Sequence, residues 1–168
     1  MHDPSLPVQA RVDALLGAAG LTWRTLVHRP AASAVEAAAV RGTSAAMGGK
    51  ALVMRGDRGL GLVLVAVPGD RRLDNQAFRR AFGLRRYRFA TAEELAEVIG
   101  LQPGTIPPFG RPVFDLPLVV DASLAATPEI AFTPGRADLS YVLDTPAWLR
   151  VAEPLRVLPL THPPQGED

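Results

Sequence analysis

The first forty residues alternate between the helical and the extended spacing of apolar side chains. Residues 8–20 place four aliphatic side chains at helical spacing and end in a glycine, which predicts an amphipathic helix. Residues 22–28 are predicted to form a strand that ends before Arg29-Pro30, because the residue before a proline is disfavoured in the α region. Ser33, with Glu36 three positions later, predicts the start of a helix over residues 34–41.

Two apolar runs follow, over residues 51–55 and 60–68, and the segment 56–59 joins them. This arrangement predicts an antiparallel hairpin. The glycines at positions 56, 59 and 61 do not form a dinucleotide-binding fingerprint, because that motif joins a strand to a helix, whereas this segment joins two strands.

The second half of the chain alternates short helices with short strands. We predict a helix over residues 74–83, a strand over 85–90, and a helix that begins at the capping box of Thr91 and stops at Gly100. A proline-rich loop over 101–115 leads to strands 117–121, 129–133 and 138–144, and then to a helix over 146–151 capped by Thr145. Residues 161–168 are expected to form a flexible tail.

Hairpins mixed with helices indicate an α+β fold rather than a doubly wound parallel sheet. The expected architecture is a mixed, mostly antiparallel, β-barrel-like sheet surrounded by helices. With 168 residues and no repeat or low-complexity linker, residues 1–168 are expected to form one domain.

Composition restricts the chemistry that this chain can perform. Hydrophobic residues make up 48% and charged residues 21%, which is typical of a globular protein. No apolar run reaches the roughly 18 residues of a membrane span, and the N-terminus lacks the pattern of a secretory signal, so we expect a cytoplasmic protein without a membrane partner. The chain has no cysteine and three histidines, two of them near its ends, so neither a thiol nucleophile, a metal site nor a cofactor is expected.

Arginine is concentrated between positions 71 and 88, although the formal net charge of the chain is only +1. Within this stretch the only acidic residue is Asp74. Such a cluster predicts a surface that contacts phosphates and loses affinity steeply with added salt. A solvated helix face beside a basic strand edge explains the same pattern. The cluster consists of Arg71, Arg72, Arg79, Arg80, Arg85, Arg86 and Arg88.

Lys50 is the only lysine of the chain, and it directly precedes the first strand of the predicted hairpin. Compositional drift toward arginine explains a single lysine without any function. A chemical explanation is that an ammonium group is a compact point charge whose pKa responds to burial, whereas a guanidinium is a planar and permanently charged fork. A site that needs one small donor would therefore retain lysine.

Two further loops carry glycine and proline in patterns typical of a binding site. Gly104 to Gly110 contains a rigid proline pair between glycines, and glycine allows the close approach of a ligand or of another backbone. Phe132 to Arg136 forms a second such turn between two predicted strands. A proline-rich connection is also common in proteins without any site there.

Taken together and in this order, these motifs resemble the YbaK and prolyl-tRNA-synthetase-associated editing domains. The resemblance covers about residues 21–151, which is the expected core of the domain. It rests on Val27-His28-Arg29-Pro30 followed by a short helix, the lone lysine before a strand, the segments at 73–83 and 91–100, the G-x-x-x-P-x-G loop, PLVVD and FTPGRADLSYVL.

The resemblance implies a trans-editing deacylase that hydrolyses the ester between a wrong amino acid and the terminal adenosine of a tRNA. It places catalytic roles on Lys50, Gly104 and Pro108. It places substrate-binding roles on His28, Thr105, Ile106, Pro107, Phe109, Gly110, Thr133, Pro134, Gly135 and Arg136. The arginine cluster, in particular Arg71, Arg72, Arg79, Arg80, Arg85 and Arg86, is expected to bind the tRNA, and no DNA partner is expected.

Several points stay open at the level of the sequence. A histidine in the position of His28 is more often a packed structural residue than a site residue, whereas the resemblance places its segment beside the amino-acid pocket. Pro107 stands where several YbaK-type relatives carry a serine, and Pro-Gly-Arg replaces the asparagine and threonine of the alanyl-tRNA editors, so alanine, serine, threonine and cysteine all remain candidate amino acids. Without a cysteine or a Ser-His-Asp set, water is expected to attack the ester, with backbone N–H groups of residues 104–110 stabilising its oxygen. The alternatives are a non-catalytic module that binds aminoacyl-tRNA or a nucleotide, and a regulatory partner of an aminoacyl-tRNA synthetase.

Overall fold

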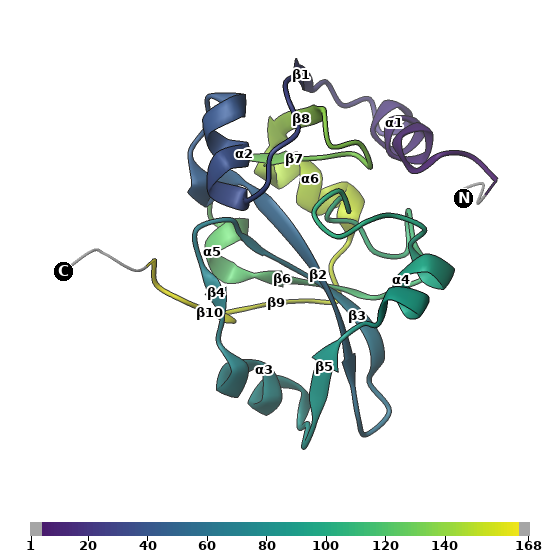
Figure 1. Cartoon of the computed structure of the whole chain (residues 1–168), viewed down its shortest axis with the longest axis vertical. Helices are drawn as coiled ribbons and strands as arrows, with labels where there is room; N and C mark the ends of the chain where they lie inside the picture. The colour runs from purple at the N-terminus through teal and green to yellow at the C-terminus, as the bar shows by residue number, and fades with distance from the viewer. Residues whose placement is uncertain (1–4, 165–168) are drawn as a thin grey trace.

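The computed structural model describes residues 5–164, which form three sheets and the helices that pack on them (Figure 1). The largest sheet has the strand order β5-β2-β3-β6-β9. Its strands are β2 (Gly49–Gly56), β3 (Gly61–Pro68), β5 (Tyr87–Phe89), β6 (Leu118–Asp121) and β9 (Arg156–Leu158). A second sheet has the order β1-β8-β7, with β1 (Arg24–Val27), β7 (Glu129–Phe132) and β8 (Leu139–Asp144). The short strands β4 (Arg72–Leu73) and β10 (Thr161–His162) pair with each other.

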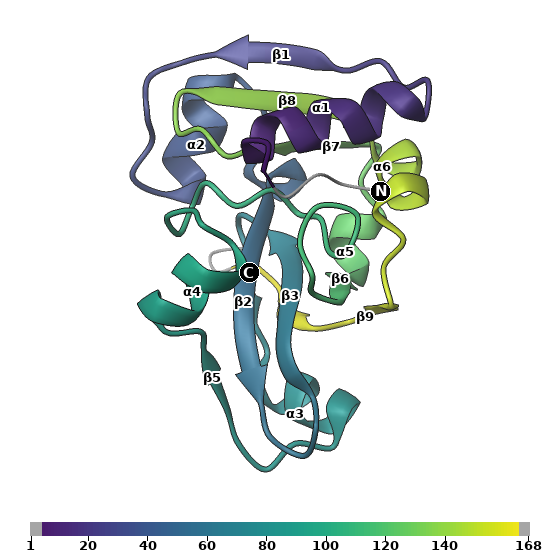
Figure 2. The same cartoon turned by 90° about the vertical axis from the view of Figure 1, so that its right-hand side faces the viewer.

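The helices lie around these sheets. In Figure 2, α1 lies across the three-stranded sheet, α2 lies at the upper end of the β2–β3 hairpin, and α3 lies at its lower end. Figure 1 shows α3 next to β5, and Phe78 of α3 packs against Tyr87 of β5. The helices are α1 (Val8–Ala18), α2 (Ala34–Arg41), α3 (Asn75–Phe82), α4 (Ala92–Val98), α5 (Ala122–Ala125) and α6 (Thr145–Ala152), with a 3₁₀ turn at Ala45–Met47. None of the helices within residues 5–164 is long and apolar enough to cross a membrane.

The hairpin predicted at 51–68 is the centre of the fold. β2 and β3 pair in antiparallel register from Gly49 opposite Pro68 to Gly56 opposite Gly61. Residues 63–67 of β3 are fully buried, because side chains on alternate faces enter two different hydrophobic clusters. The larger cluster also receives Val12 and Leu16 of α1 and Trp148 of α6. The hydrophobic core therefore extends beyond residues 21–151.

Most of the predicted helix starts are confirmed by their caps. The Ser33 side chain accepts from the Glu36 N–H at 3.1 Å, Asp74 caps α3, and Thr91 and Glu94 form a complete capping box. The carboxylate of Glu36 accepts instead from the N–H of Ala32, one residue before the cap. The cap of α6 was predicted wrongly, because Asp144 accepts from Ala147 and the buried Thr145 is already the first helical residue.

The α+β class with a mixed sheet is confirmed, but the sheet is not closed into a barrel. β3–β6 and β6–β9 are parallel, and the other strand pairs of the described residues are antiparallel. The pattern missed β4, α5, β9 and β10, since strands of two or three residues and a single helical turn are too short to show a period. The tail predicted at 161–168 is wrong at Thr161 and His162, which pair with β4; residues 165–168 lie outside the described residues.

Candidate active site

A cavity of about 530 Å³ lies between α2, the start of β2 and the loops around residues 102–106 and 133–137. Its size falls within the range of small-molecule sites. Apart from His28 and Arg41, the side chains that line it from α2 and the preceding loop are small. The lining residues include His28, Ala31, Ala32, Ser33, Ala34, Ala37, Arg41, Gly48, Gly49, Lys50, Gln102, Pro103, Gly104, Thr105, Ile106, Thr133 and Ala137.

Lys50, the second residue of β2, lines this cavity and is half-buried. Its side-chain Nζ donates to the backbone carbonyl oxygen of Arg71 at 3.4 Å. Burial lowers the pKa of Lys50, the positive charge of Arg72 lowers that pKa further, and Asp70 opposes both effects. The ammonium therefore lies in a partly desolvated site beside a second cation, where an anionic or strongly polar ligand atom would be favourable.

The loop that begins at Gly104 provides two free backbone donors beside the cavity. Gly104 has a φ of +90°, which glycine adopts without strain. The N–H groups of Thr105 and Phe109 donate to carbonyls of their own loop at 3.2 and 2.9 Å, and the two prolines have no N–H. Within the described residues this leaves the N–H groups of Gly104 and Ile106 unused at the cavity wall. The predicted electrostatic pocket is thereby reduced to these two donors.

The second half of this loop supports the site from behind. Pro107, Pro108, Phe109 and Gly110 are buried and are not among the residues that line the cavity, so the catalytic and substrate-binding roles predicted for them remain predictions. The carbonyl of Pro108 accepts from the indole N–H of Trp148 at 3.0 Å. Phe109 packs edge-on against Phe132. These contacts hold the exposed half of the loop in place.

Of the second predicted loop, only Thr133 lines the cavity. Its hydroxyl donates to the carbonyl of Gly104 at 3.2 Å and so ties the two loops together. Pro134 is buried, Gly135 packs against Val8, and the guanidinium of Arg136 is paired with Asp138 at 2.9 Å. Pro134, Gly135 and Arg136 are not among the residues that line the cavity, so their contact with the substrate remains a prediction.

His28 lines the cavity as part of a hydrogen-bonded chain that the sequence did not indicate. Its Nδ1 donates to the carbonyl of Arg29 at 2.8 Å, since a carbonyl only accepts, so Nε2 accepts from the hydroxyl of Ser140 at 2.7 Å. The same hydroxyl accepts from Nε of Arg41 at 2.7 Å. The terminal nitrogens of Arg41 have no partner among the described residues, and its half-buried guanidinium lines the cavity. In the sequence, this set of hydrogen bonds is indicated only by Ser140, a polar residue within a strand of apolar residues.

The Ser140–His28 contact is not a nucleophile and its base. Ser140 is fully buried, and the second nitrogen of His28 meets a backbone carbonyl rather than a carboxylate. Among residues 5–164, no three His, Asp or Glu side chains are grouped so that they could hold a metal ion. The groups at the cavity are thus suited to positioning and charge stabilisation.

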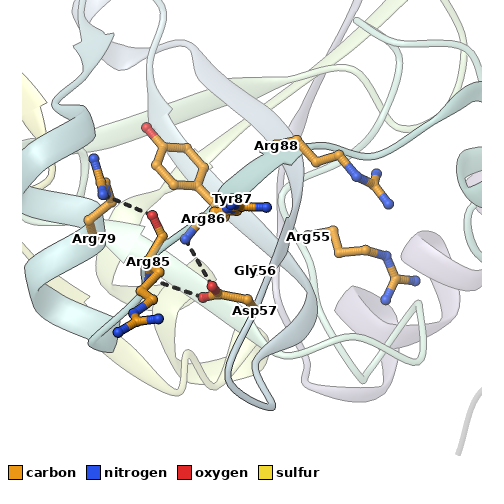
Figure 3. A pocket seen from close by; sticks show the side chains of 8 residues that line it. All are labelled: Arg55, Gly56, Asp57, Arg79, Arg85, Arg86, Tyr87 and Arg88. Atoms are coloured by element: carbon orange, nitrogen blue, oxygen red, sulfur yellow. Dashed lines mark hydrogen bonds between the residues drawn. The ribbon is translucent and has the colours of Figure 1, made fainter.

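Four arginines of the cluster, Arg79, Arg85, Arg86 and Arg88, line a pocket at the opposite end of the β2–β3 hairpin (Figure 3), whereas Arg71 and Arg72 lie beside Lys50. Arg55 and Arg88 both pair with Glu94, at 2.6 and 2.9 Å, and hold the pKa of that carboxyl well below its usual range. The backbone N–H groups of Arg85 and Arg86 donate to Asp57, which fixes their turn. Side chains without a hydrogen bond or ion pair in the described part of the chain are those of Arg71, Arg72, Arg80, Arg85 and Arg86.

Comparison with known proteins identifies the family of this chain. The family model of the aminoacyl-tRNA editing domain matches residues 28–151. The multifunctional Ser/Thr-tRNA deacylase ProXp-y of Escherichia coli K12 is 34% identical over 149 residues, covering 86% of this chain and 87% of that protein.

Two solved structures have the same fold. One is a hypothetical protein, APE2540, with a TM-score of 0.78 and 28% identity over 90% of this chain and 99% of that chain. The other is described as a candidate trans-editing enzyme for prolyl tRNA synthetase, with a TM-score of 0.76 and 28% identity over 94% of this chain and 99% of that chain. The chain therefore belongs to the aminoacyl-tRNA editing domain family, whose members of this type are deacylases of mischarged tRNA.

Proposed function

We propose that this editing-family hydrolase acts on tRNA mischarged with serine or threonine, and that the cavity between Lys50 and the Gly104 loop is its active site. The observation that carries the proposal is that Lys50 lines one cavity with Gly104 and Ile106, although it lies far from both in the sequence. An ammonium and two unused N–H groups then surround a space that is large enough for an aminoacyl ester.

The choice of serine and threonine is supported by the cavity wall and by the relative that acts on both. Alanine methyl groups restrict the space, while Ser33, Thr105 and Thr133 add hydroxyl groups to the lining. The nitrogens of Arg41 add donors that have no protein acceptor. A substrate hydroxyl would satisfy such donors, whereas an alanyl side chain would leave them unpaired, and unpaired polar groups discriminate strongly.

The reaction consumes one water for each ester. The water oxygen attacks the ester carbonyl carbon, and the negative charge that develops on the carbonyl oxygen is stabilised by the N–H groups of Gly104 and Ile106. The bond to the ribose oxygen then breaks, and the proton released by the water passes to that oxygen, which gives a free amino acid and an intact tRNA. One preorganised donor of this kind typically lowers the activation free energy by about 3 kcal/mol. Lys50 holds the acyl carbonyl or the terminal phosphate-ribose unit.

The likeness to a solved structure described as a candidate trans-editing enzyme supports action on aminoacyl-tRNA in trans, and the proposed place is the cytoplasm, where tRNAs are charged. The exposed arginines of the cluster bind the tRNA through its phosphates. An aminoacyl-tRNA synthetase that presents the tRNA is a partner of the same proposal, and co-purification of the two proteins tests it.

A deacylation panel tests this function. The purified protein is incubated with tRNA carrying serine, threonine, alanine or cysteine, and the remaining ester is measured against the spontaneous rate. Rapid loss of the seryl and threonyl esters that is abolished in Lys50→Ala is the expected result. Binding of these tRNAs without faster hydrolysis would instead indicate the non-catalytic module.

A further inference from the structure

A second hollow begins at Lys50, on the side of the lysine away from the Gly104 loop. This groove has a volume of about 570 Å³, and Lys50 lines both it and the active-site cavity. At its other end it shares Arg79, Tyr87 and Arg88 with the arginine pocket of Figure 3, which measures about 620 Å³. The three hollows thus follow β2 from the active site toward α3 and β5.

The groove exists because β2 is paired on one side only along its first half. β5 pairs with β2 only from Met54 to Gly56, so no strand of the largest sheet lies beside Lys50 and Leu52 on that side. Apolar side chains, Leu52, Met54 and Leu73, line the groove instead. The six residue steps from Lys50 to Gly56 span about 20 Å, which is long enough for several nucleotides of an extended single strand.

Cations and one aromatic ring border this apolar floor. Arg72 is exposed, and its side chain makes no hydrogen bond or ion pair in the described part of the chain. Arg79 uses one nitrogen, NH2, to donate to the carbonyl of Arg85 at 2.8 Å. Phe89 is 62% exposed, more than any other aromatic residue within residues 5–164, and it lines the groove. An aromatic face beside uncompensated cations is the combination on which single-stranded nucleic acid stacks.

We propose that this groove binds the single-stranded 3′ end of the tRNA, with Phe89 stacking on one unpaired base and with Arg72 and Arg79 contacting the flanking phosphates. The inference rests on the proposed function, since the strand that leaves the groove delivers its terminal adenosine to Lys50. The arginine pocket at the far end then meets the acceptor stem where the duplex begins.

The chemistry of the groove favours a single strand over a duplex. A duplex would present only phosphates to these arginines, and its paired bases would not reach an aromatic face. A groove that needed only charge would have no use for an exposed phenyl ring. The arginines account for affinity toward phosphates, and the exposed ring of Phe89 accounts for affinity toward an unpaired base.

The test uses Phe89→Ala, Phe89→Leu and Phe89→Trp in the full chain, with Leu155→Ala as a control that truncates another exposed apolar residue. Deacylation is measured on full-length seryl-tRNA and on seryl-adenosine, which lacks the strand. Loss of one stacked base predicts that Phe89→Ala and Phe89→Leu lower kcat/KM on the tRNA about tenfold. Phe89→Trp should retain the rate, and all three variants should cleave seryl-adenosine like the parent protein.

Three results would contradict the proposal that the groove binds the 3′ end of the tRNA. They are an unchanged rate on tRNA in Phe89→Ala, a Phe89→Leu variant as active as Phe89→Trp, and an equal loss on both substrates. Failure of the proposed function is a separate result, because the parent protein would then cleave neither ester. In that case, fluorescence anisotropy with a labelled single-stranded oligonucleotide ending in CCA tests directly whether the groove binds a single strand. About tenfold weaker binding is expected for Phe89→Ala.

Discussion

The ammonium of Lys50 donates to the backbone carbonyl of Arg71 across 3.4 Å, which places the only lysine of the chain beside the neighbouring cation, Arg72. This contact fixes the end of a long side chain at the junction of the active-site cavity and the groove. It gives a structural reason for an amine at position 50, because a guanidinium is too large and planar to occupy the same half-buried point.

The first prediction concerns the identity of this side chain. Lys50→Ala is expected to lower kcat for deacylation by about a hundredfold or more, since removal of one preorganised donor typically has this effect. Lys50→Arg is expected to be nearly as defective, because it preserves the charge but not the shape. Rates on mischarged tRNA and circular dichroism of both variants check the prediction, and an active and folded Lys50→Ala protein would contradict it.

The second prediction concerns the lowered pKa of Lys50. Deacylation that depends on the ammonium should fall as the pH rises through this pKa, below the range of an ordinary lysine. Arg72→Gln removes a repulsive charge and should raise the pKa, whereas Asp70→Asn removes an attractive one and should lower it further. Because the chain has a single lysine, its labelled side chain gives one resonance for direct NMR titration. Shifts of the same sign in both variants would refute the assignment.

The third prediction concerns the contact between the two loops. Thr133→Val removes the hydroxyl that binds the Gly104 carbonyl, so the N–H groups of Gly104 and Ile106 lose their fixed position. A displacement of about 1 Å at a catalytic group costs up to a hundredfold, so we expect kcat to fall between about tenfold and a hundredfold. Thr133→Ser keeps the hydroxyl and should retain most of the rate. Equal activity of the two variants would show that the contact does not position the loop.

The fourth prediction concerns the packing behind the site. A Cβ added at Gly110 would lie 2.7 Å from the carbonyl oxygen of Leu116, so Gly110→Ala should lower the free energy of unfolding by about 2 kcal/mol. This corresponds to a Tm decrease of roughly 4–8 °C for a chain of this size. Gly17→Ala is the matched control, because nothing lies within 4 Å of its added Cβ and it replaces a glycine within α1. Its expected effect is a gain of about 0.5–1 kcal/mol. Thermal denaturation of both variants measures the difference.

The fifth prediction separates the arginine cluster from the chemistry. Neutralising Arg79 and Arg80 together should weaken binding to all tRNAs by similar factors and reduce the slope of log affinity against log salt. Arg150→Gln is the control for loss of charge, since it lies on α6, away from the cluster. Filter binding at several salt concentrations measures the slope. A slope equal to that of the control would show that the cluster is a solvated surface.

Periodicity and capping residues predicted most of the longer elements correctly. The hairpin and the helices after Ser33, Asp74 and Thr91 depend on contacts within a few residues, so local sequence is sufficient for them. The short strands β4, β9 and β10 form only because distant segments offer them partners. For the same reason, nothing in the sequence indicated that Arg41, Ser140 and His28 form one hydrogen-bonded chain.

The sequence by itself was sufficient to identify the family, because the lone lysine and the glycine-proline loop can be recognised without the structure. Only the tertiary structure decided which residues of each loop face the cavity. Pro108 and Gly104 belong to one motif, yet the first is buried against Trp148 and the second faces the cavity. The direction of a side chain in an irregular loop is set by what packs against it, and those neighbours come from remote parts of the chain.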